Sequence, residues 1–332
     1  MSLLSRCSLS TSYFRLHSMD RGPILARIVP PWLVVALLCL LSPLPSASAA
    51  PFRIIGYLTE NAPPERVPFS LLTHINYAFL IPHDNGSLRP LANRDHLARI
   101  IRLAHGHGVK VLISVGGWGQ DRHFEAMAAS APNRRRFIRD LIHLVMSMEL
   151  DGVDLDWEYP NPGKSSRNFQ ALTTELRAAL ARPALLTAAV AAGDDHGEGI
   201  PATTFTLFDF FNIMAYDNDG ENHSSLEDAH ASLAYWRKRG LSREKIVLGL
   251  PFYSRPGEIP YRTLVATDPN AAHADAMIFR GVRNNYNGLA TVTSKTQLAR
   301  KSASGVMFWR IEDDSMGDNS LIATIHRVAA ER

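Results

Sequence analysis

The stretch DGVDLDWEYP at residues 151–160 alternates acidic and apolar side chains. Because successive side chains of a strand point to opposite faces, Asp154, Asp156 and Glu158 share one face, and the apolar residues between them share the other. A buried carboxylate without a partner is very costly, so three acids exclude a dry core on their side. The stretch therefore predicts a strand of a closed barrel. Its acidic face would line the interior, with Glu158 at the carboxyl end, where the active sites of such barrels open.

Two other structures would also hold these acids. A surface strand with solvated acids fits poorly, because large apolar groups occupy the alternate positions and Pro160 ends the run. A calcium site would take more oxygen ligands from a flexible loop. Asp151 has the opposite parity to the three acids, and we expect it to have a structural role where the strand begins.

Seven further short apolar runs accompany this stretch, so that eight strands are expected in all. They occupy residues 53–57, 74–79, 109–114, 185–190, 210–214, 246–250 and 305–309. Several runs are almost continuously apolar, which is typical of parallel strands covered on both faces. Apolar residues recur at helical spacing between the runs, over residues 97–104, 137–148 and 169–180.

This alternation of strands and helices predicts an α/β fold, the (β/α)8 TIM barrel. An open doubly wound sheet would more often have fewer strands and a nucleotide-binding fingerprint. No Pro-rich or Ser-rich linker and no internal repeat interrupts residues 51–332. We therefore expect a single domain over residues 50–332, a usual length for a barrel of this kind.

Residues 1–49 have the pattern of a removable export leader. Arginines precede an apolar run at residues 32–41, and Ala47-Ser48-Ala49 provides a small-x-small cleavage site. The run is only about half as long as the roughly 20 residues that a membrane-spanning helix needs. The pattern predicts a signal peptide and a secreted or periplasmic protein that keeps no membrane segment. A buried helix and an uncleaved anchor are the alternatives, and Met19 is an alternative start.

The composition excludes several classes of protein. With 46% hydrophobic and 20% charged residues, the chain is unlike a collagen, a disordered chain or a polytopic membrane protein. Both cysteines, Cys7 and Cys39, fall in the leader, so thiol, disulfide and Cys-zinc chemistry are excluded from the rest. Four of the 35 basic residues and one of the 32 acidic residues also fall there. The remaining chain is formally neutral, which removes the simplest argument for binding nucleic acid or an anionic membrane.

Three carboxylates on one face of a strand also have a chemical consequence. Like charges within a few ångströms of each other raise the pKa of one of them. A carboxylic acid that keeps its proton near neutral pH can act as a general acid, and Glu158 at the carboxyl end of the strand is the candidate.

The run D-x-x-D-x-D-x-E, followed by Tyr159-Pro160, resembles the signature of glycoside hydrolase family 18, the chitinases and their relatives. The resemblance covers nearly all of residues 53–312. Segments similar to family motifs on the third, sixth, seventh and eighth strands follow in the same order, at residues 114–118 (SVGGW), 214–217 (MAYD), 249–255 (GLPFYSR) and 305–309 (GVMFW).

The resemblance implies a retaining hydrolysis in which the substrate supplies the nucleophile. Glu158 would protonate the glycosidic oxygen and later deprotonate water, while the N-acetyl carbonyl of the sugar in the −1 subsite attacks the anomeric carbon. Asp156 would orient the acetamide and Asp154 would tune Asp156. Tyr216 would donate a hydrogen bond to the acetamide oxygen. The substrate would therefore carry a 2-acetamido group.

The same resemblance assigns further residues to the substrate. Asp217 would contact the −1 sugar, Trp309 would form the floor beneath it, and Ser114 would support Asp154 from behind. Five other side chains would either line this pocket or pack the core, namely Tyr57, Phe79, Met214, Tyr253 and Arg255. No cofactor and no metal is implied. The expected partner is chitin or a chito-oligosaccharide, bound by a monomer, and not nucleic acid or a membrane.

The chain departs from the family pattern in two places. Ser254 stands where the family usually has glycine, which bears on the local backbone and on Arg255. The segment after Arg255 is too short for the small α+β domain that longer members insert after the seventh strand. We therefore expect a barrel without that insertion domain and with a shallow, open groove.

Three functions are compatible with these residues. The first is a secreted chitinase-type glycosidase that hydrolyses β-1,4 bonds between N-acetylglucosamine units. The second keeps this machinery but acts on the chitobiose core of N-glycans or on peptidoglycan. The third is a lectin that binds chitin without cleaving it. Glu158 argues against the lectin, because such members of the superfamily have usually lost the acid.

Overall fold

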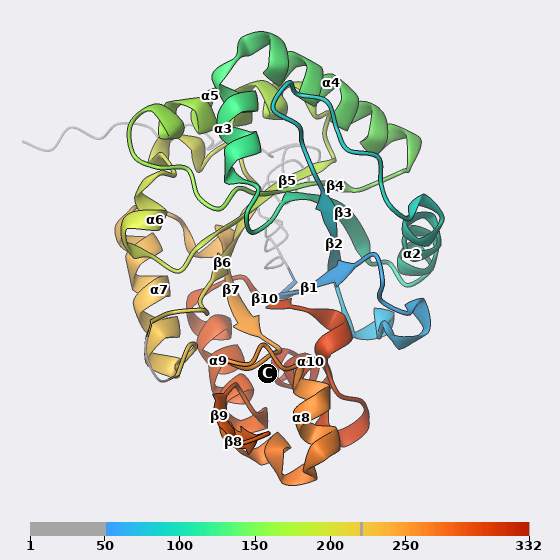
Figure 1. Ribbon diagram of the computed structural model, residues 1–332, viewed down its shortest axis with the longest axis vertical. Helices are drawn as coiled ribbons and strands as arrows, with labels where there is room; N and C mark the ends of the chain where they lie inside the picture. The colour runs from blue at the N-terminus through green and yellow to red at the C-terminus, as the bar shows by residue number, and fades with distance from the viewer. Residues whose placement is uncertain (1–50, 220–221, 332) are drawn as a thin grey trace, which may run out of the picture. The chain divides into compact units, whose positions relative to one another are not determined.

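The computed structural model describes residues 51–219 and 222–331, and the predicted leader at residues 1–49 lies outside them. Within the described residues, eight parallel strands close into a barrel in the order β1-β10-β7-β6-β5-β4-β3-β2. They are β1 (Arg53–Thr59), β2 (His74–Leu80), β3 (Lys110–Gly116), β4 (Gly152–Asp156), β5 (Leu185–Ala191), β6 (Phe210–Met214), β7 (Ile246–Pro251) and β10 (Gly305–Trp309). The colours in Figure 1 run once around the barrel and bring β10 beside β1, which confirms the predicted (β/α)8 architecture.

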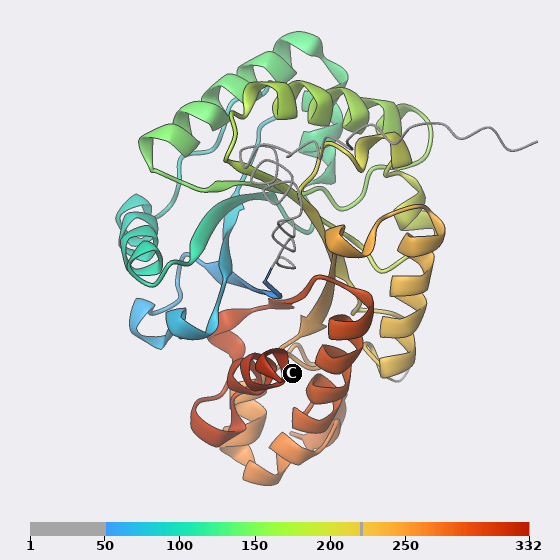
Figure 2. The same cartoon turned by 180° about the vertical axis from the view of Figure 1, so that it is seen from behind.

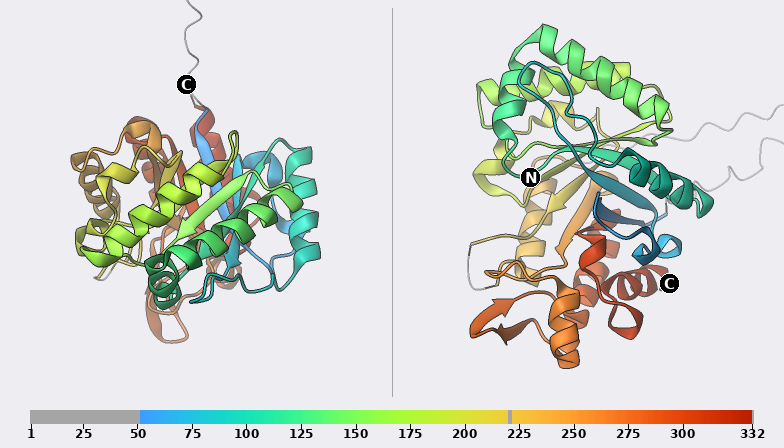
Figure 3. Two further views of the ribbon diagram at one scale, coloured as in Figure 1. Left: turned by 90° about the horizontal axis from the view of Figure 1, so that it is seen from above. Right: turned by 45° about the vertical axis from the view of Figure 1, so that its right-hand side comes forward.

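Helices cover the outside of the barrel, as the views in Figures 1, 2 and 3 show. They are α2 (Arg94–Gly106), α3 (Asp121–Ala129), α4 (Ala131–Ser147), α5 (Lys164–Ala179), α6 (Asp194–Glu198), α7 (Leu226–Lys238), α8 (Tyr261–Thr267), α9 (Leu289–Ser302) and α10 (Leu321–Ala330). Shorter 3-10 turns are η1 (Pro64–Arg66), η2 (Phe69–Leu71), η3 (Ala202–Thr204), η4 (Arg243–Lys245), η5 (Pro269–His273), η6 (Ile311–Asp313) and η7 (Gly317–Asn319). In the part of the chain that the structure covers, no helix is long and apolar enough to cross a membrane.

Two apolar layers hold the barrel together. The outer layer lies between strands and helices, and there Val153, Leu155 and Trp157 of the acidic stretch are at most 2% exposed. The inner layer fills the barrel, and its buried apolar members are Ile55, Tyr57, Ala78, Ala189, Phe210, Met214, Val247 and Met307. Burial of each large side chain contributes roughly 1.5–3 kcal/mol. The alternation of the acidic stretch therefore places its apolar residues against the helices and leaves Asp154 and Asp156 on the inner side.

Asp151 ties the start of β4 to its neighbours. Its Oδ2 accepts a hydrogen bond from the backbone N–H of Val111 at 2.7 Å and lies 2.8 Å from Nε2 of His105, at the end of α2. These contacts lie at the amino end of the strands, away from the end where the other acids gather. Asp151 therefore has the structural role that its parity predicted.

The segment between β7 and α9 forms part of the barrel unit and not a separate domain, as expected. It contains α8, η5 and a two-stranded antiparallel hairpin, β8 (Ala276–Phe279) and β9 (Val282–Asn285), which lies beside α8 in Figure 1. Ser254 joins β7 to this hairpin, because its hydroxyl donates to Oδ1 of Asn284 at 3.1 Å and accepts from the backbone N–H of Ile259 at 3.2 Å. Serine in the usual glycine position thus provides a cross-link that glycine could not make.

Candidate active site

The acids of residues 151–160 gather at the carboxyl end of β4. The strand ends at Asp156, and Glu158 follows it. The neighbouring strand β3 ends at Gly116, which pairs with Asp156 in the sheet. Gly116 has a φ of +116°, and a Cβ atom there would lie 2.2 Å from the carbonyl oxygen of Asp156. Only glycine allows the backbone after β3 to approach the acids this closely.

Donors from four other strands surround the buried carboxyl group of Asp154. Tyr57 and Ser114 donate to Oδ2, each at 2.8 Å. Thr187 and Asn212 donate to Oδ1 at 2.6 and 3.1 Å. Burial raises the pKa of Asp154, and the four hydrogen bonds oppose the rise because they favour the charged form. The group is held in one orientation and has little capacity left to bind a ligand.

Asp156 is equally buried but is not satisfied in the same way. It is 4% exposed, and its Oδ1 has no hydrogen-bond partner within the described residues. Burial raises the pKa of Asp156 well above its usual value, and the charges of Glu158 and Asp154 raise it further. An unpaired buried carboxyl oxygen is unfavourable, so this atom is suited to accept a hydrogen bond from a bound molecule.

Glu158 is partly buried beside these two acids. Burial raises its pKa to about 7, and the charge of Asp217 raises it too, whereas a hydrogen bond with Tyr159 lowers it. The sequence predicts such a rise from crowding among carboxylates, but burial is the larger cause. A carboxyl group that keeps its proton near neutral pH can donate that proton to a bound molecule.

Tyr216 lies just beyond the end of β6, and its partly buried side chain packs against Met307 and Tyr253. Its hydroxyl points to Sδ of Met307 at 3.9 Å, and its ring meets the ring of Tyr253 edge to face at 6.3 Å. A Cβ atom on Gly249 would lie 3.0 Å from the Tyr216 ring, so glycine in β7 makes room for it. Burial raises the pKa of Tyr216 well above its usual value, which keeps the hydroxyl a neutral donor.

Asp217 is held by three side chains. Tyr253 donates to its Oδ2 at 2.6 Å, and Arg255 donates to both carboxylate oxygens at 2.8 and 2.9 Å. Nδ1 of His223 lies 3.1 Å from Oδ1. Burial alone would raise the pKa of Asp217, but these hydrogen bonds outweigh burial and hold it below the usual range. Arg255 therefore reaches the site despite the serine that precedes it.

Aromatic rings form one wall of the site. Trp309, at the end of β10, is partly exposed; it stacks on Phe79 at 5.4 Å and lies 5.7 Å from the ring of Tyr57. Tyr57 is 2% exposed and Met214 is 9% exposed, so both belong mainly to the inner core. The structure thus brings together the predicted site residues at one end of the barrel, with Tyr57 and Met214 beneath the others.

Comparison with known proteins assigns the family. The chain matches the sequence model of "Glycosyl hydrolases family 18" over residues 53–314. The chain belongs to glycosyl hydrolase family 18. It is 36% identical over 177 residues to a probable endochitinase of Caenorhabditis elegans, an alignment that covers 44% of this chain and 28% of the nematode protein. The chain therefore spans less than a third of the length of that relative.

Solved structures of a chitinase and of a chitinase-like agglutinin have the same fold. A chitinase from Bacteroides thetaiotaomicron superposes with a TM-score of 0.77 at 26% identity, covering 85% of this chain and 97% of that one. A chitinase-like agglutinin from Robinia pseudoacacia superposes with a TM-score of 0.73 at 25% identity, covering 83% of this chain and 99% of that one. The fold is thus shared by a protein named as an enzyme and by a protein named as an agglutinin.

The structure adds three residues to this family 18 site that the sequence did not predict. Thr187 and Asn212 are single polar residues within apolar strand runs, at positions whose side chains face the barrel interior. Their polarity at inward-facing positions was a signal that could have identified them. His223 follows β6 in a loop and gave no such signal, because its contact with Asp217 depends on how that loop folds back.

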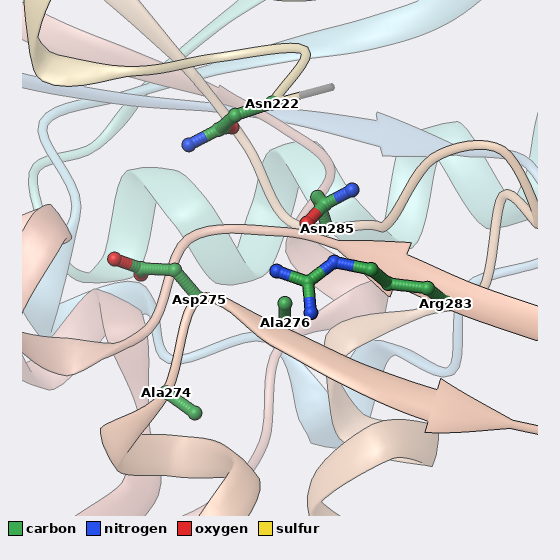
Figure 4. A pocket seen from close by; sticks show the side chains of 6 residues that line it. All are labelled: Asn222, Ala274, Asp275, Ala276, Arg283 and Asn285. Carbon is green, nitrogen blue, oxygen red and sulfur yellow. The ribbon is translucent and has the colours of Figure 1, made fainter.

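A separate hollow of about 450 Å³ lies beside the Asp217 cluster in this family 18 barrel. Figure 4 shows Asn222, from the loop after β6, on one side and the hairpin residues Arg283 and Asn285 on the other. Arg255 and Asn285 are joined by two backbone hydrogen bonds of 2.9 and 2.8 Å. Asp275 in the lining accepts from the backbone N–H of Gly288 at 2.8 Å and from the hydroxyl of Thr291 at 2.6 Å, and so ties the start of α9 to the segment before β8.

Proposed function

We propose that this chain is a secreted glycosidase that hydrolyses β-1,4 bonds between N-acetylglucosamine units by substrate-assisted, retaining catalysis. The observation that carries the proposal is the partly buried carboxyl group of Glu158 at the end of β4, after the buried acids Asp154 and Asp156 of the same strand. This burial raises the pKa of Glu158 to about 7. A general acid works best when its pKa lies near the working pH. Membership of family 18 supports the reaction type, and the leader pattern at residues 1–49 supports export.

In the first step, Glu158 gives its proton to the glycosidic oxygen, and the acetamide carbonyl of the −1 sugar attacks the anomeric carbon. The bond to the leaving sugar breaks, and an oxazolinium ion forms. In the second step, Glu158 takes a proton from the incoming water, which opens this ion and retains the configuration. No nucleophile from the protein is needed in this mechanism, because the acetamide of the substrate attacks the anomeric carbon.

The buried acids act on the acetamide group in this proposal. The free Oδ1 of Asp156 accepts the acetamide N–H and stabilises the positive charge that develops on the ring. Asp154 is fixed by its four donors, so its negative charge stays behind Asp156 and does not contact the sugar. Tyr216 donates its hydroxyl to the acetamide oxygen.

The remaining predicted residues bind the sugar ring. Trp309 presents an aromatic face to the apolar face of the −1 sugar. Asp217 keeps 36% of its side chain exposed while Arg255 and Tyr253 hold it, and this exposed edge is available to a sugar hydroxyl. Phe79 packs behind Trp309, and Tyr57 and Met214 form the base on which these residues rest.

Replacing the acid tests this function directly. Glu158→Gln keeps the size of the side chain but carries no transferable proton, and we expect the hydrolysis of chito-oligosaccharides to fall by about a factor of 10³ or more. Binding of the same oligosaccharides, measured by calorimetry, should remain within a few-fold of the unmodified protein. Retained hydrolysis by Glu158→Gln would refute the assignment of the acid.

The unmodified protein should be assayed in parallel on chito-oligosaccharides, an N-glycopeptide and peptidoglycan fragments. Products that retain the anomeric configuration are expected from the chito-oligosaccharides. If the protein cleaves only the N-glycopeptide or only the peptidoglycan fragments, that glycan is the substrate of the same catalytic residues. Binding without cleavage of any of the three would support a lectin, as the likeness to the Robinia agglutinin allows.

A further inference from the structure

A buried lysine outside the barrel interior is attached to the loop that carries Tyr216 and Asp217. Lys295 lies on α9 and is 0% exposed. Its Nζ donates hydrogen bonds to the carbonyl oxygen and to the hydroxyl of Ser224, at 2.8 and 2.7 Å, and to Oδ1 of Asn287 at 2.7 Å. All three of its N–H donors are therefore used, and two of them hold one residue of the loop.

The contacts of Ser224 lead directly to the site. The hydroxyl of Ser224 donates to the carbonyl oxygen of Ala215 at 2.7 Å, and Ala215 precedes Tyr216 in the chain. Asn287 reinforces the contact, because its side-chain amide donates to the carbonyl oxygen of Ser224 at 2.8 Å. A continuous series of buried hydrogen bonds thus runs from α9 to the backbone next to Tyr216.

The same anchor also fixes Asp217. His223, whose ring contacts Asp217, is the neighbour of Ser224 in the chain, and its carbonyl oxygen accepts from the backbone N–H of Asn218 at 3.1 Å. Asp217 itself has a φ of +60°, a left-handed conformation that costs roughly 1–2 kcal/mol for a residue other than glycine. Such a conformation persists only where the surrounding structure enforces it.

Fold stability alone does not account for a lysine at this position. Burial lowers the pKa of Lys295 to about 7, although the charges of Asp228 on α7 and Asp275 before β8 act to raise it. The three groups that accept from Nζ are uncharged, so no carboxylate in direct contact offsets the loss of water. Replacing buried charges with apolar groups of similar volume is often neutral or stabilising.

We propose that Lys295 is a positioning residue for the reaction: through Ser224 it sets where Tyr216 and Asp217 stand, although it touches neither substrate nor the reacting atoms. The proposal rests on the hydrolytic function argued above. A displacement of about 1 Å of a group that contacts the substrate can cost roughly a hundredfold in rate. The contact that Tyr216 makes with the acetamide is strongest in the transition state, so its loss should lower kcat more than it changes KM.

The experiment compares two lysines that both donate hydrogen bonds to uncharged acceptors. Lys295→Met removes the hydrogen bonds to Ser224. Lys245→Met is the matched control, because Nζ of Lys245 also donates to two carbonyl oxygens, those of Phe205 and Phe208, each at 2.7 Å. Lys245 precedes β7, so it lies at the end of the barrel opposite the site.

We expect Lys295→Met to lower kcat on chito-tetraose by about tenfold to a hundredfold while KM changes by less than about threefold. The affinity for a thiazoline mimic of the cyclised intermediate should fall in parallel with kcat. Lys245→Met should lower only the melting temperature and keep the kcat of the unmodified protein. Equal kcat in Lys295→Met, Lys245→Met and the unmodified protein would overturn the positioning role.

Ser224→Ala provides a second measurement that does not depend on removing a buried charge. It breaks the contact with Ala215 and should lower kcat in the same direction, and a double variant should lose no more than Lys295→Met alone. If Lys295→Met does not fold, Ser224→Ala decides, and unchanged kcat in that variant overturns the proposal. An unmodified protein that cleaves none of the three glycans would contradict the proposed function. An active protein whose kcat is unchanged by Lys295→Met and by Ser224→Ala would contradict only the role of Lys295.

Discussion

Two neighbouring aspartates in this site have opposite surroundings. Asp154 accepts hydrogen bonds from four strands, whereas Oδ1 of Asp156, two residues further on, accepts none within the described part of the chain. The first is fixed as a charge-bearing support, and the second is left to meet a donor from the substrate. Environment and not residue type separates their roles, as it commonly does for paired carboxyl groups in glycosidases.

The raised pKa of Glu158 leads to a prediction for the pH dependence of catalysis. Glu158 must be protonated to act as the acid, and burial raises its pKa to about 7. Above that pH the protonated fraction falls, so kcat/KM for chito-oligosaccharides should decrease by about tenfold for each further pH unit. The measurement is a profile of kcat/KM from pH 5 to pH 9 at constant ionic strength. A profile that stays flat up to pH 9 would mean that another group supplies the proton.

At the scale of the element, the sequence predicted the strands well because their signal is local. Short apolar runs, several of them almost continuous, located seven barrel strands, and the alternation of acidic and apolar residues located β4. The run at residues 109–114 begins before β3 and ends before Gly116. The end of β3 depends on its pairing with β4 through Asp156, which is a long-range contact that no local pattern contains. The role of Ser254 was not predicted for the same reason, because Asn284 is 30 residues away in the chain.

The cross-link made by Ser254 should hold the β8–β9 hairpin against β7. Ser254→Ala removes a buried hydroxyl that both donates and accepts, and leaves Oδ1 of Asn284 and the backbone N–H of Ile259 with one partner fewer. We expect a loss of about 1–2 kcal/mol in unfolding free energy. Amide exchange, followed by mass spectrometry, should become faster over residues 276–285.

Ser294→Ala is the control for this change, because Ser294 is half-buried on α9 and its hydroxyl donates within its own helix, to the carbonyl oxygen of Ala290. Its exchange pattern should match that of the unmodified protein. If exchange in the hairpin is the same in both variants, the hairpin is held by its backbone contacts with Arg255 and not by Ser254.

At the scale of the whole molecule, barrel closure creates the site. Tyr57 and Asp154 are 97 residues apart and meet only because β1 and β4 belong to one closed sheet. Side chains alternate along a strand, so the inward position of Asp154 and Asp156 could be predicted from the sequence. The register in which neighbouring strands pair could not be predicted from it. This register brings Thr187 and Asn212 within reach of Asp154.

The buried acids also predict how the stability of the whole barrel depends on pH. The pKa of Glu158 is raised from 4.5 to about 7 in the fold, so between these values the unfolded chain releases a proton that the folded chain keeps. Its contribution to stability is therefore complete below about pH 4.5 and is lost as the pH rises through 7, by about 2–3 kcal/mol. Glu158→Gln has no ionisable group at this position, so it does not lose this contribution as the pH rises.

The quantity to compare is the melting temperature of Glu158→Gln minus that of the unmodified protein. This difference should be about 4 °C larger at pH 8 than at pH 4.5. Buried acids whose pKa does not depend on Glu158, such as Asp314 with a pKa of about 6, titrate alike in both proteins and cancel in the comparison. Asp156 does not cancel, because the charge of Glu158 contributes to its raised pKa, so its pKa is less raised in Glu158→Gln. Scanning calorimetry at the two pH values measures the effect, with Glu198→Gln on the exposed end of α6 as control. An equal difference at both pH values would show that Glu158 is as easily ionised in the fold as in the unfolded chain, and the proposed general acid would lose its physical basis.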